Sequence, residues 1–485
     1  MEVMDAQDIE SPELRLSRWW TLPVVSAAQL LVVLDGTIVN IALPSAQSAL
    51  GMSDGSRPWV VTAYALAFGG LLLIGGRVGS AWGHRRAFGI GLAGFAVASA
   101  LGGAAGNQET LFAARALQGA FAAVLAPAGL SLLTMTFTGP RERGRALGVF
   151  AAVGAAGSAI GLIAGGLLAE YAGWRWCLYI NVPVALLALL GTALVPADRP
   201  HRDGGRLDVA GALLSALGFA AVVYAFTEAE AHGWGSANVL VPLTAGVLLL
   251  TAFVAVEFRA PHPLLPMRVL LHRARAGALI TVSLMFVAMF GFYLFMSYYT
   301  QTVLGYSPLQ SGLALIINAV AALLGSTLAG RLHGRLAPGL LILPGLGAAA
   351  AGVWILTRLT AQSTDVLPLY LAPALVLTGL GLGCVLPPTA SLATSDVRPQ
   401  DIGAASAAYN AAQQLGAALG TALLNTVAAG ASASYAASTV GRATRDAVSV
   451  HGYTVALAVA FGILLATMCV AGPLVLPRTG RRSGA

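Results

Sequence analysis

Apolar residues fill the chain in runs of about twenty, separated by short segments that carry arginine, proline or glycine. A run of this length spans a hydrocarbon core of roughly 30 Å as an α-helix. The runs are continuous and do not alternate with period two, so they do not have the pattern of a membrane barrel. The sequence therefore predicts an all-α integral membrane protein with fourteen transmembrane helices, near residues 20–42, 58–80, 87–106, 110–138, 145–168, 175–196, 207–227, 237–258, 275–303, 309–332, 338–358, 366–393, 402–430 and 453–476.

Composition supports a lipid environment and excludes several functions. Hydrophobic residues make up 57% of the chain and charged residues 10%, whereas a soluble domain carries roughly 25% charged residues. The net charge of +7 comes from arginines in short turns, which indicates topology and not nucleic-acid binding. The chain has no lysine, so a phosphate-binding loop with its Lys cannot form, which argues against an ATP-driven pump or another enzyme. Cys177, Cys384 and Cys469 are far apart, and we expect neither a metal site nor a cofactor.

The arginines are distributed unequally between the two sides of the expected membrane. Of 27 basic residues, 21 fall in the loops on the side of the N-terminus, 5 fall on the other side, and Arg115 lies inside a helix. The positive-inside rule then places both termini in the cytoplasm. Absence of lysine together with abundant alanine and glycine is typical of a GC-rich bacterial genome, so we expect a bacterial plasma membrane.

A weak internal repeat divides the chain into two halves. Gly76 and Gly330 each open a basic turn after a helix, at an offset of 254 residues, and Gly157 and Gly416 are offset by 259 residues. The repeat predicts a six-helix bundle over 1–196, two inserted helices with their connectors over 197–274, and a second six-helix bundle over 275–485. Transporters with paired halves bind their substrates between them.

Asp35 and Arg115 are charged residues that the pattern places deep in helices. A charged side chain at membrane depth costs about 2.5–3.5 kcal/mol, so such residues usually face a cavity and serve a function. Burial favours the neutral form of a carboxyl group, which would allow Asp35 to load and release a proton. Two alternatives stay open. Asp35 could simply be bonded to neighbouring hydroxyls or to Arg115, and Arg115 could extend to the membrane surface.

Five stretches of the chain carry recognisable motifs: LDGTIVNIALP at 34–44, WVVTAYAL at 59–66, ARALQGAFAA at 114–123, GWRWCLYINVP at 173–183 and TQTVLGYSPLQSGLAL at 300–315. These motifs resemble those of the fourteen-helix drug:proton antiporters of the major facilitator superfamily. The resemblance covers essentially the whole chain. It implies the major facilitator fold and a role in proton transfer for Asp35 and for Arg115. Thr37 and Asn40 follow Asp35 closely and could tune it, or pack against a neighbouring helix.

Two further motifs depart from the family pattern. The turn GGRVGSAWGHRR at 75–86 matches the gating motif through Gly76, Arg77, Gly83 and Arg85, but Ser80 replaces the family's Asp. We therefore expect the contact between the halves at the cytoplasmic side to be weaker or rebuilt, unless these arginines only anchor the topology. The glycines of the antiporter motif are kept, while Ser158 and Leu162 stand where proline is usual. These glycines are Gly157, Gly161 and Gly165. Their spacing by four permits close helix packing and a hinge between conformations, and close packing alone would account for their presence.

Candidate substrate contacts come from polar and aromatic positions within helices. The helix at 275–303 is rich in aromatic residues and methionine, which suit a pocket for several ligand shapes or, alternatively, packing against lipid. The candidates are Asn40, Gln118, Phe290, Tyr298, Asn318, Asn410 and Gln413. We predict a proton-coupled antiporter that exports small hydrophobic or amphipathic compounds such as drugs or antibiotics. The alternatives are a carrier or importer without proton coupling, and a non-transporting membrane sensor.

Overall fold

The computed structural model describes residues 12–52, 56, 59–196, 198, 208–261, 263–306, 308–333, 335–439 and 444–476. These residues form helices and the turns between them, without a β-strand in the described ranges. The α-helices are α1 (Pro12–Leu50), α2 (Trp59–Trp82), α3 (His84–Gly103), α4 (Gln108–Thr136), α5 (Pro140–Tyr171), α6 (Trp176–Tyr179), α7 (Asn181–Gly191), α8 (Val209–His232), α9 (Ala237–Glu257), α10 (Met267–Leu270), α11 (Arg273–Tyr298), α12 (Pro308–Leu332), α13 (Gly339–Leu356), α14 (Ala372–Thr394), α15 (Ile402–Thr439) and α16 (Arg445–Val475). Short 3-10 or π-helical turns are η1 (Thr192–Leu194), η2 (Tyr299–Val303), η3 (Leu367–Leu371) and η4 (Pro399–Asp401).

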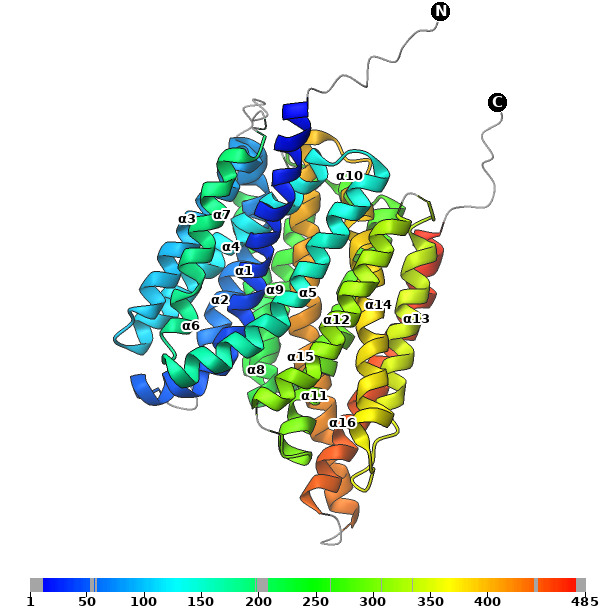
Figure 1. Ribbon diagram of the computed structural model, residues 1–485. Coiled ribbons are helices and arrows are strands. Elements are labelled where there is room, and N and C mark those ends of the chain that lie inside the picture. Colours follow the sequence, from blue (N-terminus) through cyan, green and yellow to red (C-terminus); the bar gives the residue numbers. More distant parts are fainter. Residues whose placement is uncertain are drawn as a thin grey trace, which may run out of the picture.

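The helices run up and down between two ends of one bundle (Figure 1). The described chain begins with α1 and finishes with α16 at the same end, which we call the terminal end; the opposite one is the distal end. Of the described arginines outside the helix interiors, only Arg175, Arg358 and Arg445 lie at the distal end. The unequal distribution in the sequence is thus also present in three dimensions.

Thirteen described helical segments are long and apolar enough to cross a membrane. The fourteenth expected span corresponds to α8, whose described apolar stretch is shorter, Ala210–Phe226. Large apolar side chains cover the outside of the bundle; Leu187, Leu190 and Val241, for example, are 70%, 73% and 67% exposed. An apolar surface of this extent is stable in lipid and not in water.

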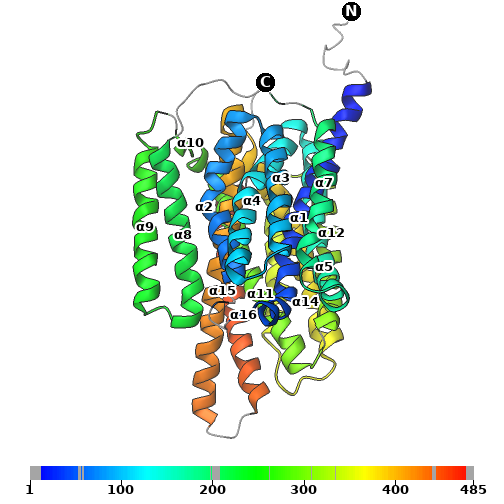
Figure 2. The same ribbon diagram turned by 90° about the vertical axis from the view of Figure 1, so that its left-hand side faces the viewer.

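The helices form two groups and a flanking pair. Helices α1 to α7 pack on one another, as do α11 to α16, and the two groups meet mainly through α5 with α12 and α2 with α15. Helices α8 and α9 stand as a pair at one side of the bundle (Figure 2), and α8 contacts both α2 and α15. This arrangement is compatible with the expected division at 196 and 274, which stays a prediction.

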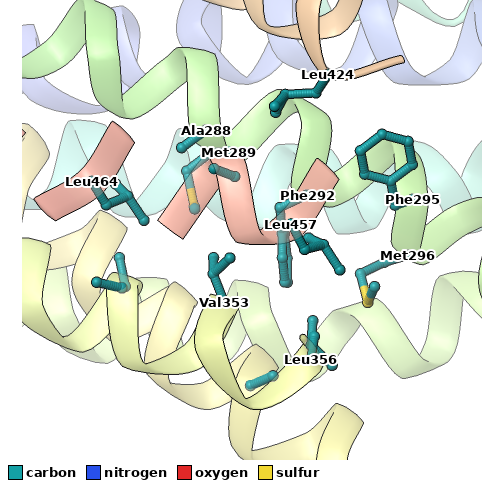
Figure 3. Close-up of a cluster of buried hydrophobic side chains, with 14 of the residues drawn as sticks. Ala288, Met289, Phe292, Phe295, Met296, Val353, Leu356, Leu424, Leu457 and Leu464 are labelled. Atoms are coloured by element: carbon teal, nitrogen blue, oxygen red, sulfur yellow. The ribbon is translucent and has the colours of Figure 1, made fainter. Parts of the chain in front are cut away.

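Most of the aromatic and methionine residues of α11 form a hydrophobic core. Met289, Phe292, Phe295 and Met296 are at most 1% exposed and pack toward α13 and α16 (Figure 3). The expectation of a ligand-binding wall along α11 is therefore wrong for these residues. Their helical spacing places them on the face of α11 that packs against the other helices of the second group. The sequence of a helix that is apolar on every face does not show which face is buried.

Close glycine contacts join the two groups at the terminal end. A side chain on Gly76 of α2 would collide with the backbone of Gly403 in α15, and one on Gly330 of α12 would collide with Gly144 in α5. Gly76 and Gly330 are separated by 254 residues, and Gly144 and Gly403 by 259, which are the offsets of the sequence repeat. The two contacts are thus equivalent under the repeat. Small residues let helix backbones approach closely in lipid, so these pairs close the terminal end.

Two side-chain contacts reinforce this closure. Ser131 of α4 donates a hydrogen bond to Ser406 of α15 over 3.1 Å. Arg143 of α5 donates to the hydroxyl of Thr394 in α14 over 2.6 Å. Both pairs join the two helix groups close to the glycine contacts. The two helix groups therefore touch each other at the terminal end, where Ser80 stands in the gating motif.

Candidate functional site

Asp35 and Arg115 form a buried ion pair near the distal end of the first helix group. Arg115 Nη1 lies 2.6 Å from Asp35 Oδ2, and the two residues are 1% and 0% exposed. Asp35 lies in the distal half of α1, and Arg115 lies two turns from the distal start of α4. Of the two alternatives left by the sequence, a bond between Asp35 and Arg115 is present, whereas the Arg115 side chain does not extend to the surface.

Amide side chains complete the hydrogen bonding of the ion pair. Asn181, the first residue of α7, donates to Asp35 Oδ1 over 2.7 Å. Gln118 donates to the same oxygen over 3.1 Å and to Ser99 Oγ over 2.6 Å, and it accepts from Arg115 Nη1 over 2.9 Å. Both carboxylate oxygens therefore have donors. This is the arrangement that a buried charge pair requires.

The remaining surroundings of Arg115 come from α2. Arg115 Nε donates to the carbonyl oxygen of Val60 over 3.1 Å, and its guanidinium lies 4.6 Å from the centre of the Tyr64 ring. A cation over an aromatic ring is stabilised by the negative ring face. A cavity of about 10 Å³, large enough for one water molecule, adjoins Arg115 and is also lined by Trp174 and Leu178 at the distal end.

Sequence reasoning singled out both charged residues of the ion pair and left their contact as one of two alternatives, but it missed part of the environment. Asn181, Ser99 and Tyr64 were not candidates, although Asn181 and Tyr64 lie inside motifs that resemble the family. A signal for Asn181 was available, because it is a polar residue that interrupts an apolar run two positions before Pro183. Nothing in the sequence pairs it with Asp35, since the two are 146 residues apart.

Thr37 does not contact Asp35. Its hydroxyl donates to the carbonyl oxygens of Val33 and Leu34 in its own helix, and it packs against Gly161 of α5. The packing interpretation is therefore correct for Thr37, because one residue separates it from Asp35 and it points toward another face of α1. The side chain of Asn40 lies outside the described part of the structure, so its role stays a prediction.

The amide candidates fall into two environments. Gln118 is fully buried in the ion-pair network, and Asn318 is buried in the second helix group, where it accepts from the Tyr293 hydroxyl over 2.7 Å and donates to Thr378 over 2.9 Å. Asn410 and Gln413 are half-buried in α15, one and two turns distal to Ser406. Because Ser406 contacts the first group, this stretch of α15 borders the space between the groups.

The two aromatic candidates are the exposed members of the α11 set. Phe290 is 43% exposed and stacks on Phe286 with ring centres 5.8 Å apart; Tyr298 is 47% exposed. Phe286 belongs to a cluster that also contains Leu130 of α4, so this face of α11 turns toward the first group. Phe290, one helical turn farther along, lies on the same face. Substrate binding by these residues stays a prediction.

The glycine face of α5 packs against α1. Gly157 lies against Leu30, Gly161 lies against Thr37, and Gly165 accepts a weak hydrogen bond from the Cys177 thiol over 3.8 Å. Close packing at these positions is therefore present. The hinge that the resemblance implies for them stays a prediction.

The turn between α2 and α3 is built around Gly83. Its φ of 92° lies in a region that favours glycine. The carboxylate of Asp198, which follows α7, accepts hydrogen bonds from the backbone amides of His84 and Arg85, the latter over 3.1 Å. An acidic group at a helix start is stabilised by the helix dipole. Arg85 also donates to the Ala193 carbonyl over 3.2 Å, which ties this turn to the end of α7.

Ser80 occupies the position of the missing gating acid. Its hydroxyl donates to the Gly76 carbonyl in its own helix over 3.3 Å and faces Gly403 at the start of α15. Arg77, next to Gly76, is half-buried. Gly76 and Gly403 approach each other closely beside Ser80. Whether this contact replaces the charged contact of the gating motif stays a prediction.

Ser80→Asp should strengthen closure of the terminal end. The added charge would face the positive start of α15, an interaction worth about 0.3–1 kcal/mol, or roughly a two- to fivefold change in population. Single cysteines at the distal end, in a background without Cys177, Cys384 and Cys469, should be labelled faster in Ser80→Asp. The neutral Ser80→Asn controls for size. Equal labelling of both variants would show that charge at position 80 does not determine the equilibrium between the two conformations.

A polytopic bundle of paired helix groups with a buried charge pair is an architecture that membrane transporters use. The sequence profile of the Major Facilitator Superfamily matches residues 25–421. The chain belongs to this superfamily. Its fold is similar to that of the human organic anion transporter MFSD10, with a TM-score of 0.63 at 13% identity over 95% of this chain and 100% of that one. A proton:xylose symporter of the same superfamily aligns with a TM-score of 0.61 at 16% identity over 93% of this chain and 96% of that one.

Several bacterial relatives carry the names of resistance and export proteins. The puromycin resistance protein of Streptomyces alboniger is 55% identical over 95% of this chain and 92% of its own length. The cephamycin export protein of Amycolatopsis lactamdurans is 40% identical over 84% of both chains. The tetracenomycin C resistance and export protein of Streptomyces glaucescens is 34% identical over 86% of this chain and 77% of its own. These similarities point to a transporter and not to an enzyme.

Proposed function

We propose that this protein exports antibiotics from a bacterial cell in exchange for protons, with Asp35 as the proton carrier. The observation that carries the proposal is the ion pair of Asp35 with Arg115, fully buried in helices that cross the membrane. A buried pair adds little stability compared with apolar packing, so its presence supports a functional role. The resistance and export names of the relatives support the direction of transport.

The proposed cycle follows from the hydrogen bonds of the carboxylate. Ionised Asp35 holds Arg115, Gln118 and Asn181 together, and these residues come from α4 and α7. A proton on Asp35 would remove the charge that attracts Arg115, so α1, α4 and α7 would be free to change their packing. The guanidinium stays charged throughout, because its affinity for its proton is too high for release. Protonation thereby biases an equilibrium between two conformations of the bundle.

The proton would enter from the distal end. The ion pair lies nearer that end, and the small cavity beside Arg115 extends toward Trp174 there. We propose that the terminal end faces the cytoplasm, because most of the described arginines lie at it. A proton from outside would then reach Asp35 while the terminal end is closed.

The substrate would bind between the two helix groups, on the distal side of the Ser131 and Ser406 contact. Asn410 and Gln413 offer hydrogen bonds there, and the exposed face of Phe290 offers an apolar surface. A mixed lining of this kind suits hydrophobic or amphipathic compounds. Given the 55% identity to a puromycin resistance protein, puromycin is the first compound to test.

Proteoliposomes with an acidic interior would test the exchange. Puromycin added outside should accumulate in the lumen while a trapped pH-sensitive dye reports loss of protons, and both signals should vanish when an ionophore removes the pH gradient. Puromycin uptake that is indifferent to the gradient would instead support a carrier without proton coupling. Failure to move any compound from a panel of antibiotics would contradict export as a whole.

Asn181→Leu should slow proton-driven export by about tenfold at neutral pH. The variant keeps the branched shape of the side chain, with a somewhat larger volume, but removes one donor to the ionised carboxylate, a contact worth about 1.5–3 kcal/mol. Thr37→Val is the matched control, because Thr37 lies in the same helix as Asp35 without touching it. A similar loss in both variants would indicate a general packing defect.

A further inference from the structure

A basic groove opens on the outside of the bundle at the terminal end, where α1, α5 and α12 meet. It encloses about 520 Å³ and is lined by Trp19 and Leu22 of α1, Arg145 and Val149 of α5, and Arg331 and Arg335 at the end of α12. In Figure 1 these three helices lie side by side on one face of the bundle. We propose that this groove binds an acidic phospholipid of the surrounding membrane.

The arginines of the groove are available for an anion. The side chains of Arg145, Arg331 and Arg335 are exposed, and none has a hydrogen-bond or ion-pair partner within the described ranges. Two neighbouring arginines at this end are engaged: Arg18 pairs with Glu142, and Arg143 bonds Thr394. Three adjacent guanidinium groups repel one another, so a phosphate group placed among them would relieve repulsion and accept charge-assisted hydrogen bonds.

The walls of the groove select an occupant with an apolar part. Trp19 and Val149 are 42% and 44% exposed, and on α12 the neighbouring Leu324 and Leu328 are 59% and 50% exposed. These side chains continue the apolar surface toward the middle of the bundle. A free phosphate ion would use the arginines alone, whereas a phospholipid would place its acyl chains along this surface. Basic pockets between membrane helices on the cytoplasmic side are suited to anionic headgroups.

The groove joins the two helix groups. Helices α1 and α5 belong to the first group and α12 belongs to the second. Gly330, which lines the groove, is also in close contact with the backbone of Gly144 in α5. A lipid held by arginines of both groups would be released, or lose part of its contacts, when the terminal end opens. The lipid would therefore stabilise the conformation in which the terminal end is closed. The shift in the equilibrium is set by the ratio of its affinities for the two conformations.

Binding of short-chain phosphatidylglycerol to the detergent-purified protein, followed by native mass spectrometry, tests the proposal. The variant carrying Arg145→Gln, Arg331→Gln and Arg335→Gln should bind it at least about tenfold more weakly, since each basic group near a lipid surface contributes. The matched control carries Arg86→Gln, Arg259→Gln and Arg273→Gln, which remove the same charge from exposed positions at the same end. It should bind within about threefold of the unmodified protein.

Two competitors identify the ligand chemistry. Short-chain phosphatidylcholine and inorganic phosphate, each at the same concentration, should leave phosphatidylglycerol bound. Displacement by inorganic phosphate would overturn the lipid assignment in favour of a small-anion site. Equal weakening in both triple variants would mean that general charge, and not this groove, attracts the lipid. If the groove variant is not folded by size-exclusion chromatography, each single substitution is measured, and unchanged affinity in all three would also overturn the proposal.

Discussion

Asp35→Asn should abolish proton-driven export, with a loss of at least about 100-fold in the rate of antibiotic extrusion. Asparagine keeps the volume of the side chain but cannot bind and release a proton, so the step that couples transport to the gradient is absent. The rate is to be measured in proteoliposomes with an imposed pH gradient and, in an efflux-deficient bacterial strain, as resistance. Full resistance in Asp35→Asn would exclude Asp35 as the proton carrier.

Two controls separate coupling from folding. Asp35→Glu keeps an ionisable carboxyl and should retain part of the activity, although its longer side chain must repack between Arg115 and Asn181. Asp35→Asn leaves the Arg115 charge unpaired and should unfold at a lower temperature than the unmodified protein. It should still be inserted and should elute as a folded protein, because Arg115 keeps Gln118, Val60 and the Tyr64 ring as partners. Loss of folded protein in Asp35→Asn, with normal Asp35→Glu, would indicate a structural role for the charge.

Arg115→Ala should impair export as strongly as loss of the carboxyl and should also destabilise the protein. Removing one partner of a buried ion pair leaves an uncompensated charge, which costs about 3–5 kcal/mol. Arg115→Lys should recover only part of the activity, because one ammonium group cannot replace the guanidinium that bonds Asp35, Gln118 and the Val60 carbonyl together. Export rate and thermal unfolding in detergent would be measured for each variant.

The double variant Asp35→Asn and Arg115→Gln distinguishes stability from function. It contains no unpaired charge, so its unfolding temperature should lie above that of Arg115→Ala, while proton-driven export should stay absent. Recovery of export in this neutral double variant would show that the pair is structural. Normal export in Arg115→Ala and Arg115→Lys would likewise contradict a role for Arg115 in the cycle.

The sequence by itself determined the class of the protein and the position of its helices. In lipid, the backbone of a continuous apolar run can form all its hydrogen bonds only as a helix. The observed helices therefore agree with the expected ranges, apart from ends such as those of α1 and α15, which extend farther. The superfamily, too, was recognisable from motifs such as that around Asp35, and the profile match confirms it. Asp35 and Arg115 could be singled out from the sequence because a charged side chain at membrane depth has an unfavourable free energy of insertion, whichever helices are its neighbours.

The tertiary structure alone decided which side chains meet. Asn181 and Asp35 are far apart in the chain, and their contact exists only because α7 packs beside α1. Along α11, the sequence could not tell Phe292, which is buried, from Phe290, which is exposed. Every face of such a helix is apolar, because lipid and protein core select the same side chains. Hydrophobicity therefore fixes that a helix spans the membrane, whereas shape and hydrogen bonding between helices fix its rotation and its neighbours.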